Sequence, residues 1–307
     1  MTQSAKDTGP ESGVRPWLGG AFALLSAVTI SLTLVLVRMT YDAGADALAV
    51  NTTRSIAFAA FLYAFLRLRG RPTGLPAGPR LTSWLLGVLM CVELYGLFAA
   101  VQYISVSLAA LIFYTYPMLI LLITRFTAGE PIRPSRVAAL ATAFTGLALV
   151  LQASGEAPDW RGLAWASVAT IAFAGVVILS ERTLQGRDSR VVTFHMIAVA
   201  AAILVGVSAF MWPLDWPAAL GGWLALLAAS VTFAIATMSL FAAIQAIGPL
   251  RTAVIDNTAP VWAIGFAMLL LGESLAPLQW LGAALVIGAV SAMQLTLWRR
   301  RNTGKTG

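Results

Sequence analysis

Charged residues are scarce in this chain of 307 residues: they make up 11% of it, whereas hydrophobic residues make up 59%. A water-soluble globular domain carries about 25% charged residues, so the composition excludes that class and indicates a membrane protein. The apolar runs are long and continuous. They favour membrane-spanning helices over the alternating strands of a barrel.

The sequence holds one cysteine, Cys91, and one histidine, His195. A disulfide framework within the chain is excluded, and no Cys or His cluster has metal-ligand spacing, so we expect no metal and no cofactor. The chain also lacks a GxxxxGK[ST] loop, which excludes direct use of ATP. No Ser/His/Asp arrangement is apparent, and we therefore expect that the protein is not an enzyme.

The middle of the chain is repeated near its end. Residues 97–104, LFAAVQYI, return as residues 240–247, LFAAIQAI, at an offset of 143 residues that continues without a gap. The same offset aligns Pro117 with Pro260, and Gly129-Glu130 with Gly272-Glu273. A duplicated helical membrane domain is typical of transporters.

Hydropathy and the loop signals predict ten membrane-spanning helices, so the fold class is an all-α integral membrane protein. The expected spans are residues 17–38, 46–66, 82–102, 105–125, 135–152, 161–181, 191–212, 219–245, 250–271 and 278–298. Five spans in each copy is an odd number, so the two five-helix repeats must be inverted relative to each other in the membrane. We expect a cytoplasmic tail (1–16), a first repeat (17–152), a second repeat (161–298) and a basic cytoplasmic tail (299–307).

Lysine and arginine predict the orientation of the chain. With the N-terminus in the cytoplasm, 17 of the 20 basic residues fall in cytoplasmic segments, and the exceptions are Arg38, Arg54 and Arg161. Both termini are therefore expected in the cytoplasm and the protein in the inner (plasma) membrane. The net charge of +7 is explained by these loops without a nucleic-acid partner.

These features together resemble the EamA branch of the drug/metabolite transporter superfamily. The resemblance is carried by the duplicated unit, the ten spans and the twice-occurring pattern Pro117…Gly129-Glu130 and Pro260…Gly272-Glu273, over about residues 17–298. It implies the fold of bacterial exporters of amino acids and other metabolites, which work as secondary carriers without a bound cofactor. The shared motifs do not identify the substrate.

Ionisable residues inside a membrane are costly, so each one is a candidate functional residue. The expected spans contain Arg54, Glu93, His195 and Asp256. Glu93, near the middle of its span, is a candidate proton carrier or partner of a substrate ammonium, with a helix-tying glutamate as the alternative. Arg54 can bind a substrate carboxylate, neutralise Glu93 or cap helix carbonyls. Together they would suit a zwitterion.

Asp256 has Phe113 as its repeat partner, so this acid is peculiar to the second half. The asymmetry favours a site, while pairing with Arg251 is the alternative. His195 is expected to be a packing or interfacial residue. Aromatic residues gather around the polar positions, and a minority of them should line a substrate cavity. The candidates are Tyr95, Tyr114, Trp165 and Trp262.

Pro117 and Pro260 lie at equivalent places inside two spans, where a proline allows a kink, and we expect them to act as hinges. Small residues four apart predict close packing of the fifth and tenth spans, with dimerisation as an open alternative. They are Ala138, Thr142 and Gly146 in the first half, and Ala284, Gly288 and Ala292 in the second. The two Gly-Glu pairs are interpreted as structural, because glycine ends a helix and glutamate can cap one.

The sequence therefore predicts a secondary transporter that exports a small metabolite, an amino acid or a related amphipathic compound, by alternating access. Coupling to protons through Glu93 is the bolder part of this hypothesis. An importer of a vitamin or another metabolite is the alternative within the same fold. An integral-membrane enzyme acting on lipid is the alternative from another class, and it should show clustered catalytic residues near one interface. The expected partners are a small-molecule substrate, the lipid bilayer and protons, and the protein is a monomer or a homodimer.

Overall fold

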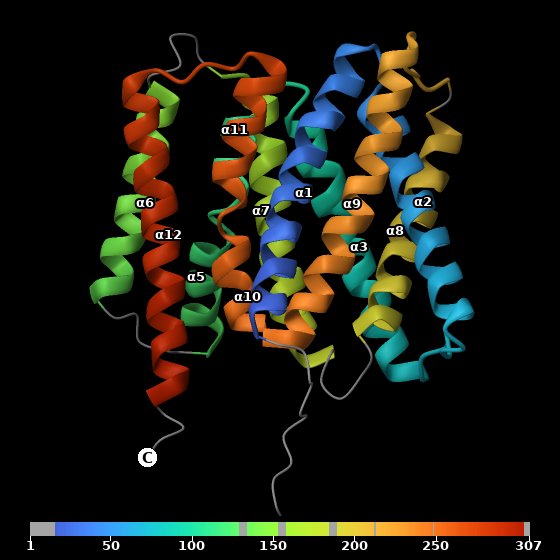
Figure 1. Cartoon of the computed structure of the whole chain (residues 1–307), viewed down its shortest axis with the longest axis horizontal. Helices are drawn as coiled ribbons and strands as arrows, with labels where there is room; N and C mark the ends of the chain where they lie inside the picture. Colours follow the sequence, from blue (N-terminus) through green and yellow to red (C-terminus); the bar gives the residue numbers. More distant parts are fainter. Residues whose placement is uncertain are drawn as a thin grey trace, which may run out of the picture.

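The computed structural model describes residues 16–128, 134–152, 158–183, 189–211, 213–247 and 249–303. Within these ranges all the regular structure is α-helical, in segments that stand side by side in one bundle, roughly perpendicular to its longest axis (Figure 1). Their bounds are α1 Pro16–Asp42, α2 Ala47–Leu68, α3 Ala77–Ala100, α4 Val106–Phe113, α5 Tyr116–Ala128, α6 Pro134–Gln152, α7 Trp160–Thr183, α8 Ser189–Phe210, α9 Leu220–Ile247, α10 Pro249–Asp256, α11 Ala259–Leu271 and α12 Pro277–Thr303.

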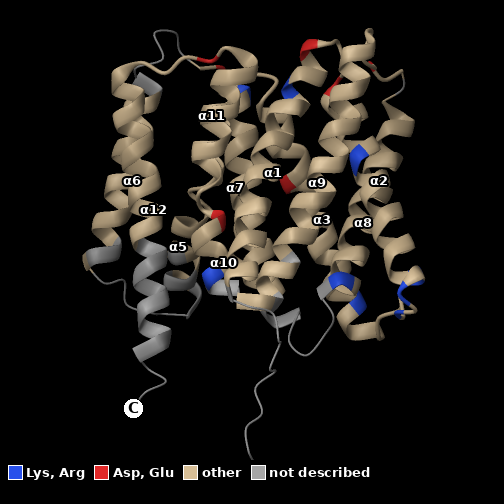
Figure 2. Ribbon diagram, viewed as in Figure 1, with Lys and Arg blue, Asp and Glu red and all other residues tan. Residues whose placement is uncertain are grey.

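Length and hydropathy make this a multi-pass membrane protein. Seven apolar helical segments are long enough to span a membrane, and three shorter ones, Val106–Ile120, Val137–Val150 and Pro277–Ala292, lie where further spans are expected. Acidic and basic residues lie mostly near the two ends of the bundle and are sparse between them (Figure 2). The helical fold class is confirmed, while the count of ten spans stays a prediction.

One span begins earlier than the sequence predicts. Helix α3 starts at Ala77 instead of residue 82, so Glu93 lies sixteen residues from its start and seven from its end, and not midway. The predicted start was wrong because the prolines near residue 77 suggest a loop. Proline is nevertheless tolerated in a helix's first turn, where backbone N–H groups have no partner in the helix, and Pro79 lies there.

The two halves are interleaved, with the symmetry that the 143-residue offset requires. The first helix of each half packs along the third helix of the other: α1 lies against α9, and α7 against α3. The last helices of the halves, α6 and α12, pack against each other at one side of the bundle (Figure 1). A common core therefore joins both halves, and it contains buried residues from α1 to α4, α6 to α9, α11 and α12.

The small-residue stripes are confirmed in part as packing surfaces. A Cβ atom built on Gly146 of α6 would lie 2.6 Å from the carbonyl oxygen of Gly282 of α12, and one on Gly282 would collide with the carbonyl oxygen of Gly146. The backbones of α6 and α12 thus touch here, which only glycine permits. Ala284, Gly288 and Ala292 are all exposed, and a Cβ atom on Gly288 would meet nothing within 4 Å, so the predicted stripe on α12 was wrong. In the stripe on α6, Ala138 is exposed as well.

The short helices of the two halves pack differently at the two ends of the bundle. We call the end at which α3 leads into α4 the upper end, and the end at which α10 begins the lower end, as in Figure 1. Helices α4 and α11 pack together toward the upper end. Their repeat counterparts are α10 and α5, which share at most isolated contacts within the described residues. The halves are therefore not in equivalent conformations.

Candidate functional site

Each half contains one helix that is interrupted inside the bundle. Helix α4 ends at Phe113 and α5 begins at Tyr116, while α10 ends at Asp256 and α11 begins at Ala259, so both breaks fall at positions 143 residues apart. Pro117 and Pro260 explain the breaks, because a proline cannot donate to the carbonyl four residues earlier and its ring clashes with that carbonyl. The predicted kinks are therefore complete interruptions, and the hinge role of the prolines stays a prediction.

The first break is satisfied by hydroxyls and enclosed by rings. The carbonyl oxygen of Ile112 accepts hydrogen bonds from the hydroxyl of Thr115, at 2.6 Å, and from its backbone N–H, at 3.1 Å. Aromatic rings of α4, α5 and α7 surround this point with centroid separations of 4.7–6.4 Å. They belong to Phe113, Tyr114, Tyr116 and Phe173.

The second break carries polar atoms without partners. Asn257 is used structurally, because its amide donates to the hydroxyl of Ser291 of α12 at 3.0 Å. One carboxylate oxygen of Asp256 and the hydroxyl of Thr258 are enclosed and have no hydrogen-bond partner. Thr115, the repeat counterpart of Thr258, does have one. Unsatisfied buried polar atoms are rare in folded proteins, so this break is a candidate binding site.

Asp256 is not neutralised by a basic side chain. The alternative interpretation of the sequence, an ion pair with Arg251, is wrong, because Arg251 is exposed and no ion pair joins the two residues. The neighbours of Asp256 are Ser26 of α1, Tyr114 and Tyr116. None of them carries a positive charge. Within the described part of the chain, none of the groups that interact electrostatically with Asp256 is basic.

A second buried polar cluster joins α2, α3 and α9. Arg54 is 2% exposed, and its guanidinium lies over the rings of Phe98, at 3.9 Å, and Phe233, at 4.6 Å. It donates to the side-chain oxygen of Asn51 at 3.3 Å. Glu93, 4% exposed, lies near enough for electrostatic attraction to Arg54 but outside ion-pair distance. The structure thus brings the two predicted residues into one enclosed region.

The remaining predicted residues fall in different surroundings. Tyr95 and Trp165 are half-buried and pack edge to face at 5.3 Å between α3 and α7. Trp262 is 38% exposed on α11. His195 contacts the carbonyl oxygen of Thr73 at 2.9 Å and so holds a loop to α8, as expected of a packing residue. In the described residues no group of three or more His, Cys, Asp and Glu side chains could hold a metal.

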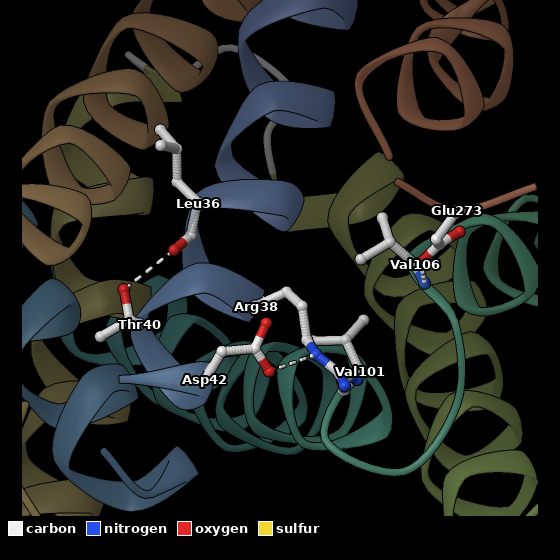
Figure 3. A network of polar contacts seen from close by, with 7 residues as sticks. All are labelled: Leu36, Arg38, Thr40, Asp42, Val101, Val106 and Glu273. Carbon is white, nitrogen blue, oxygen red and sulfur yellow. Dashed lines mark hydrogen bonds and ion pairs between the residues drawn. The ribbon is translucent and has the colours of Figure 1, made fainter. Parts of the chain in front are cut away.

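A contact that the sequence did not predict joins the two halves near the upper end (Figure 3). Gly272 ends α11 with a φ of +68°, and Glu273 follows it. The carboxylate of Glu273 accepts from the backbone N–H groups of Val106, at 2.7 Å, and Ser107, at 3.2 Å, and from the Ser107 hydroxyl at 2.6 Å. Glu273 therefore caps α4, a helix of the other half. A carboxylate stabilises a helix N-terminus both by accepting orphan N–H groups and through the helix dipole.

The corresponding contact at the lower end cannot use the same bonds. The 143-residue offset maps Val106 to Pro249, which has no backbone N–H, and Ser107 to Leu250, which has no hydroxyl. Glu130, the counterpart of Glu273, lies outside the described residues. The interpretation of Gly272-Glu273 as structural is consistent with this cap. Sequence spacing alone could not show that its partner is 166 residues away.

Neutralising Glu273 should loosen the upper end. In Glu273→Gln the side chain keeps one acceptor oxygen but loses its charge, and we expect the α4–α11 contact to weaken by about 2 kcal/mol, or roughly thirtyfold. The measurement is the labelling rate of a buried cysteine, Leu108→Cys, by a thiol reagent in a Cys91→Ala background. Asp42→Asn, which removes an exposed ion pair with Arg38, is the control at the same end. Equal labelling of the two variants would contradict a closing role for Glu273.

Comparison with known proteins identifies related sequences and folds. The model of the EamA-like transporter family matches residues 17–152 and 160–294. A solved structure described only as "Crystal structure of protein" is similar over 92% of this chain and 98% of its own, at 22% sequence identity and a TM-score of 0.63. At that identity the similarity shows the fold alone. No curated protein matches the chain.

Proposed function

Because the chain belongs to the EamA-like transporter family, we propose that it is a secondary transporter that exports a small amphipathic metabolite by alternating access. The substrate class that we propose is amino acids and related compounds. The lower end of the bundle would face the cytoplasm of the cell and the upper end its outside, since the basic residues of the sequence cluster on the lower side. The bilayer would be the inner membrane.

The observation that carries the proposal is the pair of equivalent helix breaks. Interrupted helices near the middle of a membrane expose polar backbone and side-chain groups, and transporters bind their substrates at such places, between repeats. Here the break between α10 and α11 holds Asp256 and Thr258 with unpartnered atoms. The break between α4 and α5 supplies the aromatic wall.

The unequal closure of the two ends supports alternating access. In an inverted repeat, exchanging the conformations of the halves converts a carrier open at one end into one open at the other. Packing of α4 on α11, without equal packing of α5 on α10, corresponds to one such conformation, closed at the upper end. The proposed cycle would reverse these two contacts. The scattered positions of Glu93 and Asp256, on separate helices, do not favour the lipid-enzyme alternative.

We propose Glu93 as the residue that couples transport to protons. Its side chain is enclosed, one of its oxygens has no partner, and Arg54 lies near it, so gain of a proton would change the charge balance of the cluster. In proteoliposomes with a pH gradient and a panel of labelled amino acids, wild-type protein should accumulate substrate. Glu93→Gln should lose accumulation but keep exchange across equal pH, and Glu93→Asp should keep both in part.

This test separates coupling from folding, because retained exchange shows that the variant is intact. Full proton-dependent accumulation by Glu93→Gln would remove Glu93 from the coupling role. Absence of any flux with wild-type protein across the panel would contradict the proposed substrate class.

A further inference from the structure

Asp256 differs from Glu93, the buried acid of the expected spans: it is half-buried, with one enclosed carboxylate oxygen. Glu93 has the guanidinium of Arg54 near it, whereas no basic side chain interacts with Asp256. A charge left uncompensated inside a membrane is unfavourable. An external positive group at this position would remove that cost.

The groups around Asp256 suit a cation with several N–H donors. Asp256 and Thr258 each present an oxygen without a partner, and Ser26 of α1 lies beside the carboxylate. The hydroxyl of Ser31 donates to the carbonyl oxygen of Ala259 at 2.7 Å, which holds α1 against the start of α11. A primary ammonium has three donors and needs acceptors of this kind.

The end of α10 adds to the attraction. Asp256 is the last residue of that helix, and the carbonyl groups at a helix C-terminus carry partial negative charge. Half-helix ends of this kind hold cations in other interrupted transporter helices.

Aromatic rings decide between an organic cation and a metal ion. Tyr114 and Tyr116 both lie near Asp256, and together with Phe113 and Phe173 they form a cluster of rings. Ring faces attract ammonium groups and pack against an apolar substrate body, whereas a small metal ion prefers a complete shell of oxygen atoms. The site as a whole fits an amine that carries an aromatic or apolar group.

The basic candidate residue, Arg54, is not accessible to a substrate. Arg54 is enclosed by Phe98 and Phe233, bonded to Asn51 and 2% exposed. A substrate carboxylate therefore has no accessible partner there, which removes the reason to require a zwitterion.

We infer that Asp256, Thr258 and Ser26 form a subsite for the ammonium group of the substrate, and that the substrate class is apolar or aromatic primary amines, with or without a carboxylate. This inference rests on the proposed transport function and narrows it. An amine that lacks the carboxylate of an amino acid but is otherwise the same should bind as tightly as that amino acid.

The test is thermal unfolding of the purified full-length protein with three matched probes: phenethylamine, 2-phenylethanol and phenylalanine. A ligand that binds the folded state raises the unfolding midpoint. We expect phenethylamine and phenylalanine to raise it and the neutral alcohol to leave it unchanged. Asp256→Asn should weaken amine binding at least tenfold, and Asp256→Glu should retain it. Asp215→Asn, the same change at an exposed loop residue, is the control.

Three outcomes would overturn the inference. They are equal stabilisation by the alcohol, unchanged amine binding by Asp256→Asn, and stabilisation by sodium chloride over choline chloride without amine, which would indicate a metal-ion site. If Asp256→Asn does not fold, the comparison of amine and alcohol on wild-type protein and Asp256→Glu decides. Flux of another substrate class in liposomes, without amine binding, would leave the transporter proposal standing and reject the ammonium subsite alone.

Discussion

Replacement of Arg54 by methionine is expected to destabilise the protein by about 3–5 kcal/mol, because it leaves the buried Glu93 without its positive neighbour. Methionine fills a similar volume between the rings of Phe98 and Phe233, so lost packing contributes little. The measurement is the free energy of unfolding in detergent, followed by helix content. Arg67→Met, an exposed arginine on the same helix, is the control and should cost less than about 1 kcal/mol.

The double variant Arg54→Met/Glu93→Gln should recover most of this loss. Removing both charges leaves neither one buried alone, and such neutral replacements are often as stable as the two buried charges that they replace. Glu93→Gln alone should cost less than Arg54→Met alone, because the guanidinium keeps its two aromatic faces and Asn51. If the two single losses simply add in the double variant, Arg54 and Glu93 do not interact.

Substitution of Gly282 by valine should separate α6 from α12. The new side chain would collide with the carbonyl oxygen of Gly146 and would lie 3.0 Å from the backbone nitrogen of Val150. Backbone atoms cannot rotate away as a side chain can, so we expect a loss at or above the usual overpacking range, about 3 kcal/mol or more. The unfolding midpoint and the yield of monodisperse protein measure it.

Gly288→Val provides the matched control on the same helix. A Cβ there meets nothing within 4 Å, so its effect should stay within the small helix-propensity difference of less than about 1 kcal/mol. Equal yields and midpoints for the two variants would show that α6 and α12 are not held at this glycine contact.

Much of the architecture follows from the sequence because the duplication repeats the signals. α4 and α10, and likewise α5 and α11, have bounds that differ by the predicted offset of 143 residues. The prolines located both interruptions to within a few residues. Their effect was underestimated, because one kinked helix was expected in each half. Instead, α4 and α5 are separated by Tyr114-Thr115, and α10 and α11 by Asn257-Thr258.

The polar contacts of the site could not be predicted in the same way. Hydropathy identifies Arg54 and Glu93 as buried, but their proximity depends on how α2 and α3 pack, and that leaves no local pattern. The small-residue spacing on α12 indicated Gly288, although the rotation of the helix presents Gly282 to α6 instead. The bonds of Glu273 join residues 166 and 167 positions apart, and a single sequence holds no signal for such a pair.

The cap that Glu273 places on α4 should affect which of the two conformations the protein favours when no substrate is bound. In a protein of two identical inverted repeats the two conformations would be equally stable, because opening either end would break the same bonds. At the upper end, the backbone N–H of Val106 and the hydroxyl of Ser107 donate to Glu273. At the lower end, their counterparts Pro249 and Leu250 lack these donors. Under the proposed mechanism, the substrate-free protein should therefore favour the conformation that is open toward the lower end, where the substrate would bind. The preference for one conformation would then depend on the two junctions that lead into α4 and α10. Exchanging a few residues between these junctions should reverse the preference without a change of fold.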